Sequence, residues 1–355
     1  MNNMKNLLAA DLDNILDRTR LFWDELRGSN IFITGGTGFI GCWLLESFIW
    51  ANDILNLQAK VTVLTRSQEA FYKKSPHLAS HPSISWHLGD VRSFEFPTGN
   101  FSHIIHAATE VNNYAQKNDF RDLLDVIVEG TRHTLDFAIA CQAQKFLFTS
   151  SGAVYGKQPN EITHIHESYL GAPDTLDSRS IYGEGKRIAE LLCTIYANQF
   201  GLETKIARCF ALIGAYLPLD SHLATSSFFR DRLQNQTIQI QGDGTNLRSY
   251  LYASDVTAWL WTILFKGSSC YAYNVGSEEA ISIAGLAKKI AQLDLPNLNI
   301  AIAKIADPHQ SIERYVPSTQ RAKDMLGLQE TVSLEDALQK TLTWYASMDK
   351  SYAKI

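Results

Sequence analysis

The chain has 355 residues, of which 45% are hydrophobic and 19% charged, and its formal net charge at pH 7 is -5. These values fit a soluble globular protein of one large domain or two fused domains. The small negative charge argues against nucleic acid or an anionic membrane as a partner, and no apolar run reaches the ~20 residues that span a bilayer. The five cysteines show no metal-ligand spacing, so we expect no metal site, and reduced thiols in a cytoplasmic protein.

Residues 1–29 are expected to form an N-terminal amphipathic helix. Apolar side chains, among them Leu12, Leu16 and Trp23, recur near one face at helical spacing. We expect this face to pack on the domain that follows, and contact with a second subunit is the alternative.

A glycine-rich stretch, Asn30–Gly41, reads NIFITGGTGFIG. It predicts a buried strand, a tight turn and the start of a helix. Such glycines let the backbone approach a pyrophosphate, and the first N–H groups of the helix face the anion. This context predicts a dinucleotide cradle, and a glycine-rich turn without a ligand is the alternative. The residues expected to bind the cofactor are Gly35, Thr37, Gly38, Phe39, Ile40 and Gly41.

A second buried strand, Val61–Thr65, ends where a dinucleotide fold meets the adenosine ribose. An acidic side chain at this point would bind the ribose hydroxyl of NAD, but the chain has Arg66 instead. A guanidinium group suits a 2′-phosphate and therefore favours NADP. Stacking of Arg66 on the adenine is the alternative, and it leaves NAD open.

Three further strands are expected at Ile84–Leu88, Phe101–Ala108 and Lys145–Ser150. Segments of helical period separate the strands, most clearly at Leu123–Cys141. This alternation predicts an α/β fold with a doubly wound parallel sheet.

Two of these strands are followed by candidate cofactor ligands. Asp90 and Val91 follow the third strand, and Asp90 could bind the adenine amino group or only cap a turn. The fourth strand runs into Ala107, Ala108 and Thr109, whose small side chains leave room for a cofactor at the edge of the sheet.

Candidate catalytic residues follow the fifth strand. Ser151 stands at its end, and Tyr182 and Lys186 come later, four residues apart at the start of a helix. A tyrosine is a poor base near neutral pH, but an ammonium group on the same helical face favours the phenolate and lowers the pKa. The trio predicts Tyr182 as a general acid/base, tuned by Lys186 and assisted by the Ser151 hydroxyl. A surface Tyr–Lys pair without a function is the alternative.

Taken together, these motifs resemble the extended short-chain dehydrogenases/reductases of the nucleotide-sugar epimerase/dehydratase family. The matching stretches are TGGTGFIG at 34–41, GDV at 89–91, HAAT at 106–109, SSGAVYG at 150–156, YGEGK at 182–186, RCFALIG at 208–214, GDGTNLRSYLYASD at 242–255 and YNVG at 273–276. The resemblance covers Asn30 to Trp344. It implies an NAD(P)-binding Rossmann domain at 30–213. It also implies a smaller mixed α/β substrate lobe, mainly 214–355, some segments of which return to the Rossmann sheet.

The resemblance also implies roles for individual residues. Tyr182 matches the catalytic base, Lys186 the ligand of the cofactor ribose, and Ser151 the hydroxyl that orients the substrate. Arg248 matches an arginine that contacts the nucleotide diphosphate, which agrees with the bidentate grip of a guanidinium group on phosphate. Arg314 is expected to act in the same way. Surface ion pairs are the alternative for both arginines.

The sequence departs from the family pattern at four positions. The 4,6-dehydratases of the family carry an Asp-Glu pair where this chain has Gly152 and Ala153, and the decarboxylases usually carry a Glu at Ala153. Neither residue here can serve as the acid or base that dehydration needs. Ile127 and Ala211 stand where the family has asparagines, and the change at Ala211 bears on how the substrate's sugar or diphosphate is held.

We therefore expect an NAD(P)-dependent nucleotide-sugar epimerase. Tyr182 would take a proton from a ring hydroxyl at C4, and hydride would leave and return to give the epimer. The alternatives are an NADPH-dependent keto-sugar reductase or dehydrogenase, a decarboxylase or dehydratase, and a non-catalytic cofactor sensor. The resemblance further implies a homodimer through the helices near 120–140 and 182–200, and a place in polysaccharide biosynthesis.

Overall fold

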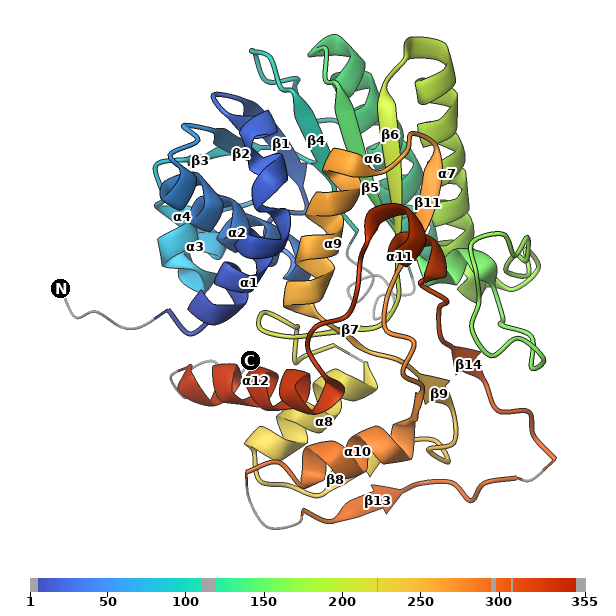
Figure 1. Cartoon of the computed structure of the whole chain (residues 1–355). Helices are drawn as coiled ribbons and strands as arrows, with labels where there is room; N and C mark the ends of the chain where they lie inside the picture. Colours follow the sequence, from blue (N-terminus) through green and yellow to red (C-terminus); the bar gives the residue numbers. More distant parts are fainter. Residues whose placement is uncertain (1–5, 110–118, 222, 295–297, 308, 349–355) are drawn as a thin grey trace. The chain divides into compact units, whose positions relative to one another are not determined.

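A computed structural model describes residues 6–109, 119–221, 223–294, 298–307 and 309–348 (Figure 1). The chain divides into two compact units. The first comprises Met1–Gly156, Ala172–Arg208 and Thr257–Tyr273, and the second comprises Lys157–Gly171, Cys209–Val256 and Asn274–Ile355.

A seven-stranded sheet of order β11-β6-β5-β4-β1-β2-β3 forms the centre of the first unit. Its strands are β1 (Asn30–Thr34), β2 (Lys60–Thr65), β3 (Ile84–Leu88), β4 (His103–His106), β5 (Lys145–Ser151), β6 (Glu203–Cys209) and β11 (Tyr271–Val275). β1 pairs in parallel with β2 on one side and β4 on the other, so that Thr34 lies opposite Leu64 and His106. The order of the strands reverses between β1 and β4, where such folds bind ligands. The predicted doubly wound parallel sheet is confirmed.

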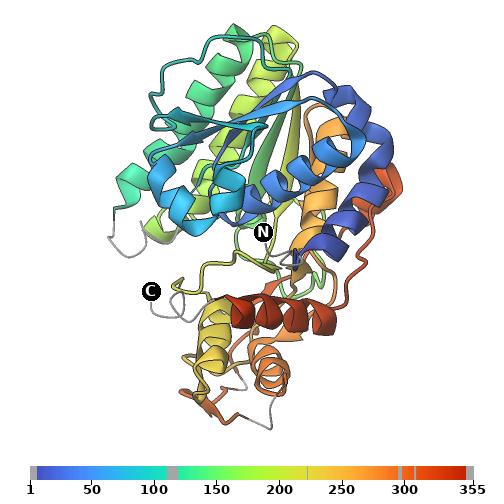
Figure 2. The ribbon, with the colours of Figure 1, turned by 90° about the vertical axis from the view of Figure 1, so that its left-hand side faces the viewer.

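Helices cover both faces of this sheet. They are α2 (Phe39–Leu55), α3 (Gln68–Lys74), α4 (Pro76–Ala79), α6 (Phe120–Ala140), α7 (Ile181–Phe200) and α9 (Ala253–Lys266), with short 3₁₀ turns η2 (Gly152–Tyr155) and η3 (Ser178–Ser180). Figures 1 and 2 show α6 and α7 side by side on one face and α2 with α9 on the other. Trp261 of α9 donates a hydrogen bond to Ser47 of α2 at 2.8 Å, which joins the second pair.

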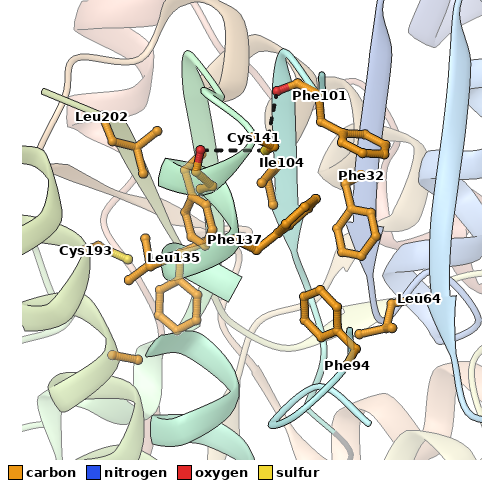
Figure 3. Close-up of a cluster of buried hydrophobic side chains, with 14 of the residues drawn as sticks. Phe32, Leu64, Phe94, Phe101, Ile104, Leu135, Phe137, Cys141, Cys193 and Leu202 are labelled. Atoms are coloured by element: carbon orange, nitrogen blue, oxygen red, sulfur yellow. Dashed lines mark hydrogen bonds between the residues drawn. The ribbon is translucent and has the colours of Figure 1, made fainter. Parts of the chain in front are cut away.

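An aromatic cluster fills the space between the sheet and α6 (Figure 3). Phe32 of β1 lies at its centre, with ring centroids 4.8 Å from Phe137 and 5.5 Å from Phe94. Each of these three rings is at most 3% exposed. Burial of the aromatic surface and the edge-to-face geometry both stabilise this contact of sheet and helix.

The N-terminal segment packs on the first unit, as predicted, through α1 (Ala9–Thr19) and the 3₁₀ turn η1 (Arg20–Leu26). Trp23 is 0% exposed, and its ring centroid lies 4.7 Å from that of Trp261. The expected single helix changes to a 3₁₀ turn at Arg20. In that turn the Trp23 indole donates to the Thr19 hydroxyl at 2.8 Å, which satisfies a buried polar group.

The second unit is a smaller mixture of short strands and helices. The strands are β7 (Leu212–Ile213), β8 (Ile238–Ile240), β9 (Leu247–Arg248), β10 (Leu251–Tyr252), β12 (Ile281–Ser282), β13 (Ile300–Ile302) and β14 (Arg314–Tyr315), and the helices are α8 (Ala224–Leu233), α10 (Ile283–Ala291), α11 (Gln320–Leu326) and α12 (Leu334–Ser347). Among the helices that the structure describes, none has the length and apolar character needed to cross a membrane.

Candidate active site

The glycine turn brings β1 against the end of β4. A Cβ atom on Gly35, whose φ is +71°, would lie 2.4 Å from the carbonyl of Ala107. A Cβ atom on Gly41 would lie 2.2 Å from the carbonyl oxygen of Gly35. Side chains at these positions would therefore fill the turn that leads into α2. The backbone is shaped as a cradle for an anionic group at the start of a helix, which fits the pyrophosphate of a dinucleotide.

Two basic side chains lie at the ends of β1 and β2, and only one of them was predicted. Arg66 follows β2 directly, as expected, and its side chain is exposed. Lys74, at the end of α3, donates from Nζ to the carbonyl oxygen of Thr37 in the glycine turn at 2.9 Å. Sequence reasoning missed Lys74, because a lysine in the last turn of a short helix is ordinary.

Asp90 is held by Arg92. Its Oδ1 accepts from Arg92 Nε at 2.8 Å, and its Oδ2 accepts from Nη2 at 2.9 Å. These hydrogen bonds lower the pKa of Asp90 despite its partial burial. Oδ1 also accepts from the Arg92 backbone N–H at 2.9 Å, so the turn-capping role is present. Contact with an adenine stays a prediction.

Lys186 is the best-defined member of the predicted catalytic trio. Its side chain is 2% exposed, and Nζ donates to the carbonyl oxygen of Thr149 at 2.7 Å and to the Thr109 hydroxyl at 3.0 Å. The ammonium group lies 5.9 Å from the ring centroid of Tyr182, which is half-buried on the same helix. The expected helical face is therefore present in α7 and faces the ends of β4 and β5.

Ser151 ends β5 and is 6% exposed. Its Oγ accepts a hydrogen bond from the N–H of Ala153 at 3.1 Å, and this bond starts the turn η2. Gly152 and Ala153 occupy that turn, so it offers no carboxylate next to Ser151.

His106, in the predicted HAAT motif, is a buried neutral side chain. Burial and the charge of Lys186 lower its pKa to about 3. Nδ1 lies 2.7 Å from the Thr34 hydroxyl, and Nε2 lies 3.0 Å from the hydroxyl of Thr131, which itself donates to Ile127 O. The network therefore assigns the proton to Nε2. It ties β4 to β1 and α6 beneath the glycine turn.

Arg248 and Arg314 lie in the second unit, on neighbouring strands. The register pairs Arg248 with Tyr315 and Arg314 with Leu247. Paired residues share a face of a sheet and successive residues alternate, so the two arginines point to opposite faces. Arg248 also lies 3.5 Å from Glu313. The structure therefore does not bring the two predicted phosphate ligands together. Within the described residues, no cluster of metal-ligating side chains is found.

The family model that matches this chain is that of the NAD dependent epimerase/dehydratase family, over residues 31–276. Among curated relatives, UDP-glucuronic acid decarboxylase 6 of Arabidopsis thaliana is 28% identical over 91% of this chain and 90% of its own. UDP-glucuronic acid decarboxylase 1 of Danio rerio is 26% identical over 92% of this chain and 74% of its own.

Solved structures with the same fold include UDP-glucuronic acid 4-epimerase from Bacillus cereus in complex with UDP-glucuronic acid and NAD. It is 20% identical, with a TM-score of 0.74 over 89% of this chain and 98% of the other. The dTDP-glucose 4,6-dehydratase from Bacillus anthracis in complex with NAD is 19% identical, with a TM-score of 0.74 over 92% of this chain and 100% of the other.

Proposed function

The chain belongs to the NAD dependent epimerase/dehydratase family, and on this premise we propose that it is a nucleotide-sugar epimerase. It would oxidise a ring hydroxyl, at C4, and re-form it with the opposite configuration. The observation that carries the proposal is the buried ammonium group of Lys186, which joins the ends of β4 and β5 beside the Tyr182 ring. Relatives named for their action on UDP-glucuronic acid support a nucleotide sugar as the substrate.

Each residue of the trio has a distinct task. Tyr182 accepts the proton of the sugar hydroxyl and later returns it. Lys186, on the same face of α7, favours the phenolate that this task needs. Ser151, at the end of β5, hydrogen-bonds the substrate oxygen and so fixes its direction. Bound NAD(P) would supply reversible hydride transfer, and the chain supplies the binding and the electrostatics.

The residues present fit a dinucleotide, and those at the ends of β1 and β2 favour NADP. The backbone from Gly35 to Gly41 would hold the pyrophosphate. Arg66 and Lys74 would face the ribose, where two cations suit a 2′-phosphate better than a hydroxyl. The positive charge of Arg66 contributes to the lowered pKa of Asp90, whose direct ion-pair partner is Arg92.

Decarboxylation is the second candidate, because the curated relatives reported above are UDP-glucuronic acid decarboxylases. Against it stands Ala153, at the position where the resemblance leads us to expect a glutamate. Dehydration is weaker still, since Gly152 and Ala153 offer no acid or base beside Ser151. A keto-sugar reductase that consumes NADPH fits the same trio and the same Arg66.

One experiment separates these outcomes. The protein is incubated with UDP-glucose, UDP-glucuronic acid, dTDP-glucose, GDP-mannose and a CDP-sugar, and the products are analysed by mass spectrometry and NMR. The proposal expects a product of unchanged mass with inverted configuration at C4. Loss of carbon dioxide from UDP-glucuronic acid would establish the decarboxylase instead, and loss of water the dehydratase.

The proposal includes a homodimer through α6 and α7. Ile188, Leu191 and Ile195 form an exposed apolar stripe on α7, and Leu191 is 60% exposed. Their spacing of three and four residues is that of a helix-pairing face. The proposal also includes Arg248 as the ligand of the diphosphate. It further includes a cytoplasmic location, in keeping with five free cysteines, and a role in polysaccharide biosynthesis.

A further inference from the structure

A buried ion pair lies behind the turn that carries Ser151. Arg208 of β6 donates from Nε to Glu190 Oε1 at 2.9 Å and from Nη2 to Glu190 Oε2 at 2.6 Å. The two side chains are 16% and 11% exposed. Burial lowers the pKa of the Arg208 guanidinium, but the hydrogen bonds and charge of Glu190 outweigh it and raise the pKa overall. The Arg208 guanidinium therefore stays positively charged in this pair.

The ion pair binds both flanks of the Ser151 turn. Ser150, the residue before Ser151, donates to Glu190 Oε1 at 2.6 Å. Tyr155, the last residue of η2, accepts from Arg208 Nη1 at 2.9 Å, and the guanidinium carbon lies 4.8 Å from its ring centroid. Ser150 is 3% and Tyr155 2% exposed, so these contacts are made away from solvent and are correspondingly specific.

The same pair fixes the turn to the catalytic face of α7. Tyr182, Lys186 and Glu190 follow one another at four-residue spacing and so share one face of the helix. The turn η2 also approaches α7 closely. A Cβ atom on Gly183 would lie 2.6 Å from the carbonyl oxygen of Ala153, and Arg187 of α7 donates to Val154 O at 3.2 Å.

We propose that Glu190 and Arg208 are positioning residues, which set the Ser151 hydroxyl relative to the Tyr182 phenol by holding Ser150 and Tyr155. The inference rests on the proposed function for its catalytic consequence only. Neither residue of the pair touches the substrate. Their effect is on the alignment of two groups that must reach one substrate oxygen, and misplacement by about 1 Å can cost ~100-fold in rate.

The surroundings of the pair make it testable. Glu190 and Arg208 line a cavity of about 510 Å³, together with Arg187, Leu191, Thr194 and Cys270. Water in such a cavity can hydrogen-bond the Glu190 carboxylate or the Arg208 guanidinium when Ser150 or Tyr155 loses its hydroxyl. The variants Ser150→Ala and Tyr155→Phe keep the ion pair and the tyrosine ring, so we expect both to fold. Tyr196→Phe is the matched control, since its hydroxyl binds Asp136 of α6 and leaves the turn untouched.

The first measurement is amide hydrogen exchange of residues 151–156, which needs no substrate. The inference expects faster exchange than in the parent protein for Ser150→Ala and Tyr155→Phe. The exchange rate in Tyr196→Phe should equal that of the parent. Unchanged exchange in the first two variants overturns it, whether or not the protein proves to be an epimerase.

The second measurement is turnover of whichever of UDP-glucose, UDP-glucuronic acid and dTDP-glucose reacts fastest. A fall in kcat of ~10- to 100-fold is expected in both variants, with KM and the affinity for NADP⁺ unchanged. The double variant should lose less than the product of the single losses, because either change already releases the turn. Faster exchange with kcat unchanged would show that the pair is only structural and would overturn the inference. If the parent protein turns over none of the three, nor GDP-mannose or the CDP-sugar, the proposed function fails and the exchange measurement alone decides.

Discussion

The Nζ atom of Lys186 donates to the backbone carbonyl oxygen of Thr149 at 2.7 Å. A backbone carbonyl is an acceptor that no side-chain change at position 149 removes. The bond therefore ties the helix that carries Tyr182 to the strand that ends at Ser151. The buried ammonium group of Lys186 thus links the helix of Tyr182 to the strand of Ser151 within the first unit.

Lys186→Met tests the charge at this position while it keeps the length of the side chain. We expect turnover to fall at least ~100-fold, as for loss of general acid–base assistance, and the melting temperature to fall because Thr149 O loses its partner. Lys205→Met is the control, since Lys205 is 2% exposed and pairs with Glu203 at 2.5 Å. That variant should lose stability but keep its kcat. Equal losses of kcat in both variants would contradict a specific role for Lys186.

Cofactor choice depends on Arg66 and Lys74 in this account. Lys74→Met should weaken binding of NADP⁺ and of 2′,5′-ADP by ~10- to 100-fold and leave NAD⁺ binding nearly unchanged, because a charge-assisted contact to phosphate contributes about 1.5–3 kcal/mol. Titration calorimetry measures all three ligands. Lys73→Met is the control: Lys73 is 75% exposed and pairs with Glu69. If Arg66→Ala instead weakens NAD⁺ and NADP⁺ equally, the arginine stacks on adenine.

The glycine turn should tolerate no side chain at Gly41. Its Cβ atom would lie 2.2 Å from the carbonyl oxygen of Gly35. We expect Gly41→Ala to abolish dinucleotide binding, which is measured by the fluorescence of bound NADPH. At Gly242 the nearest atom to an added Cβ is 4.0 Å away, so Gly242→Ala should bind normally. Normal binding by Gly41→Ala would mean that the turn is not the cradle.

A pH-dependent contact anchors the N-terminal segment. Burial raises the pKa of Glu25, but hydrogen bonds from His103 and Lys145 lower it to about 2. A carboxyl group with a depressed pKa stabilises the fold above its unfolded pKa of 4.5 and loses that effect as the pH falls towards 2.

Glu25→Gln should therefore lower the melting temperature at pH 7 by about 2 °C. The difference from the parent should shrink as the pH falls from about 5 towards 3. Asp24→Asn is the control, since Asp24 is 80% exposed beside Arg27. Scanning calorimetry across this range gives the comparison, and a difference independent of pH would refute the role of the Glu25 charge.

The alternation of strand and helix could be predicted from the sequence because buried parallel strands are short apolar runs. The prediction of Ile84–Leu88 matches β3 residue for residue. The face shared by Tyr182 and Lys186 followed from helical spacing alone. The change of the N-terminal helix to a 3₁₀ turn could not be predicted from the sequence, because the spacing of apolar residues is nearly the same in an α-helix and a 3₁₀ turn.

The contact between Glu190 and Arg208 could not be predicted from the sequence, for a physical reason. Glu190 continues the stripe of Tyr182 and Lys186, and that spacing could have marked it. Its partner, however, comes from β6, and only the packing of α7 on the sheet brings the two together. The same holds for Lys74, which reaches Thr37 across 37 residues of chain.

The most direct test of the account is product formation by Tyr182→Phe, compared with Tyr196→Phe on the same helix. Both variants lose one phenolic hydroxyl, but Tyr196 binds Asp136, whereas Tyr182 lies beside Lys186. Product is measured by NMR with the nucleotide sugar that the parent protein converts, after calorimetry has shown that both variants bind NADP⁺. The account predicts parental rates for Tyr196→Phe and a loss of at least ~100-fold for Tyr182→Phe; parental turnover by Tyr182→Phe would contradict it.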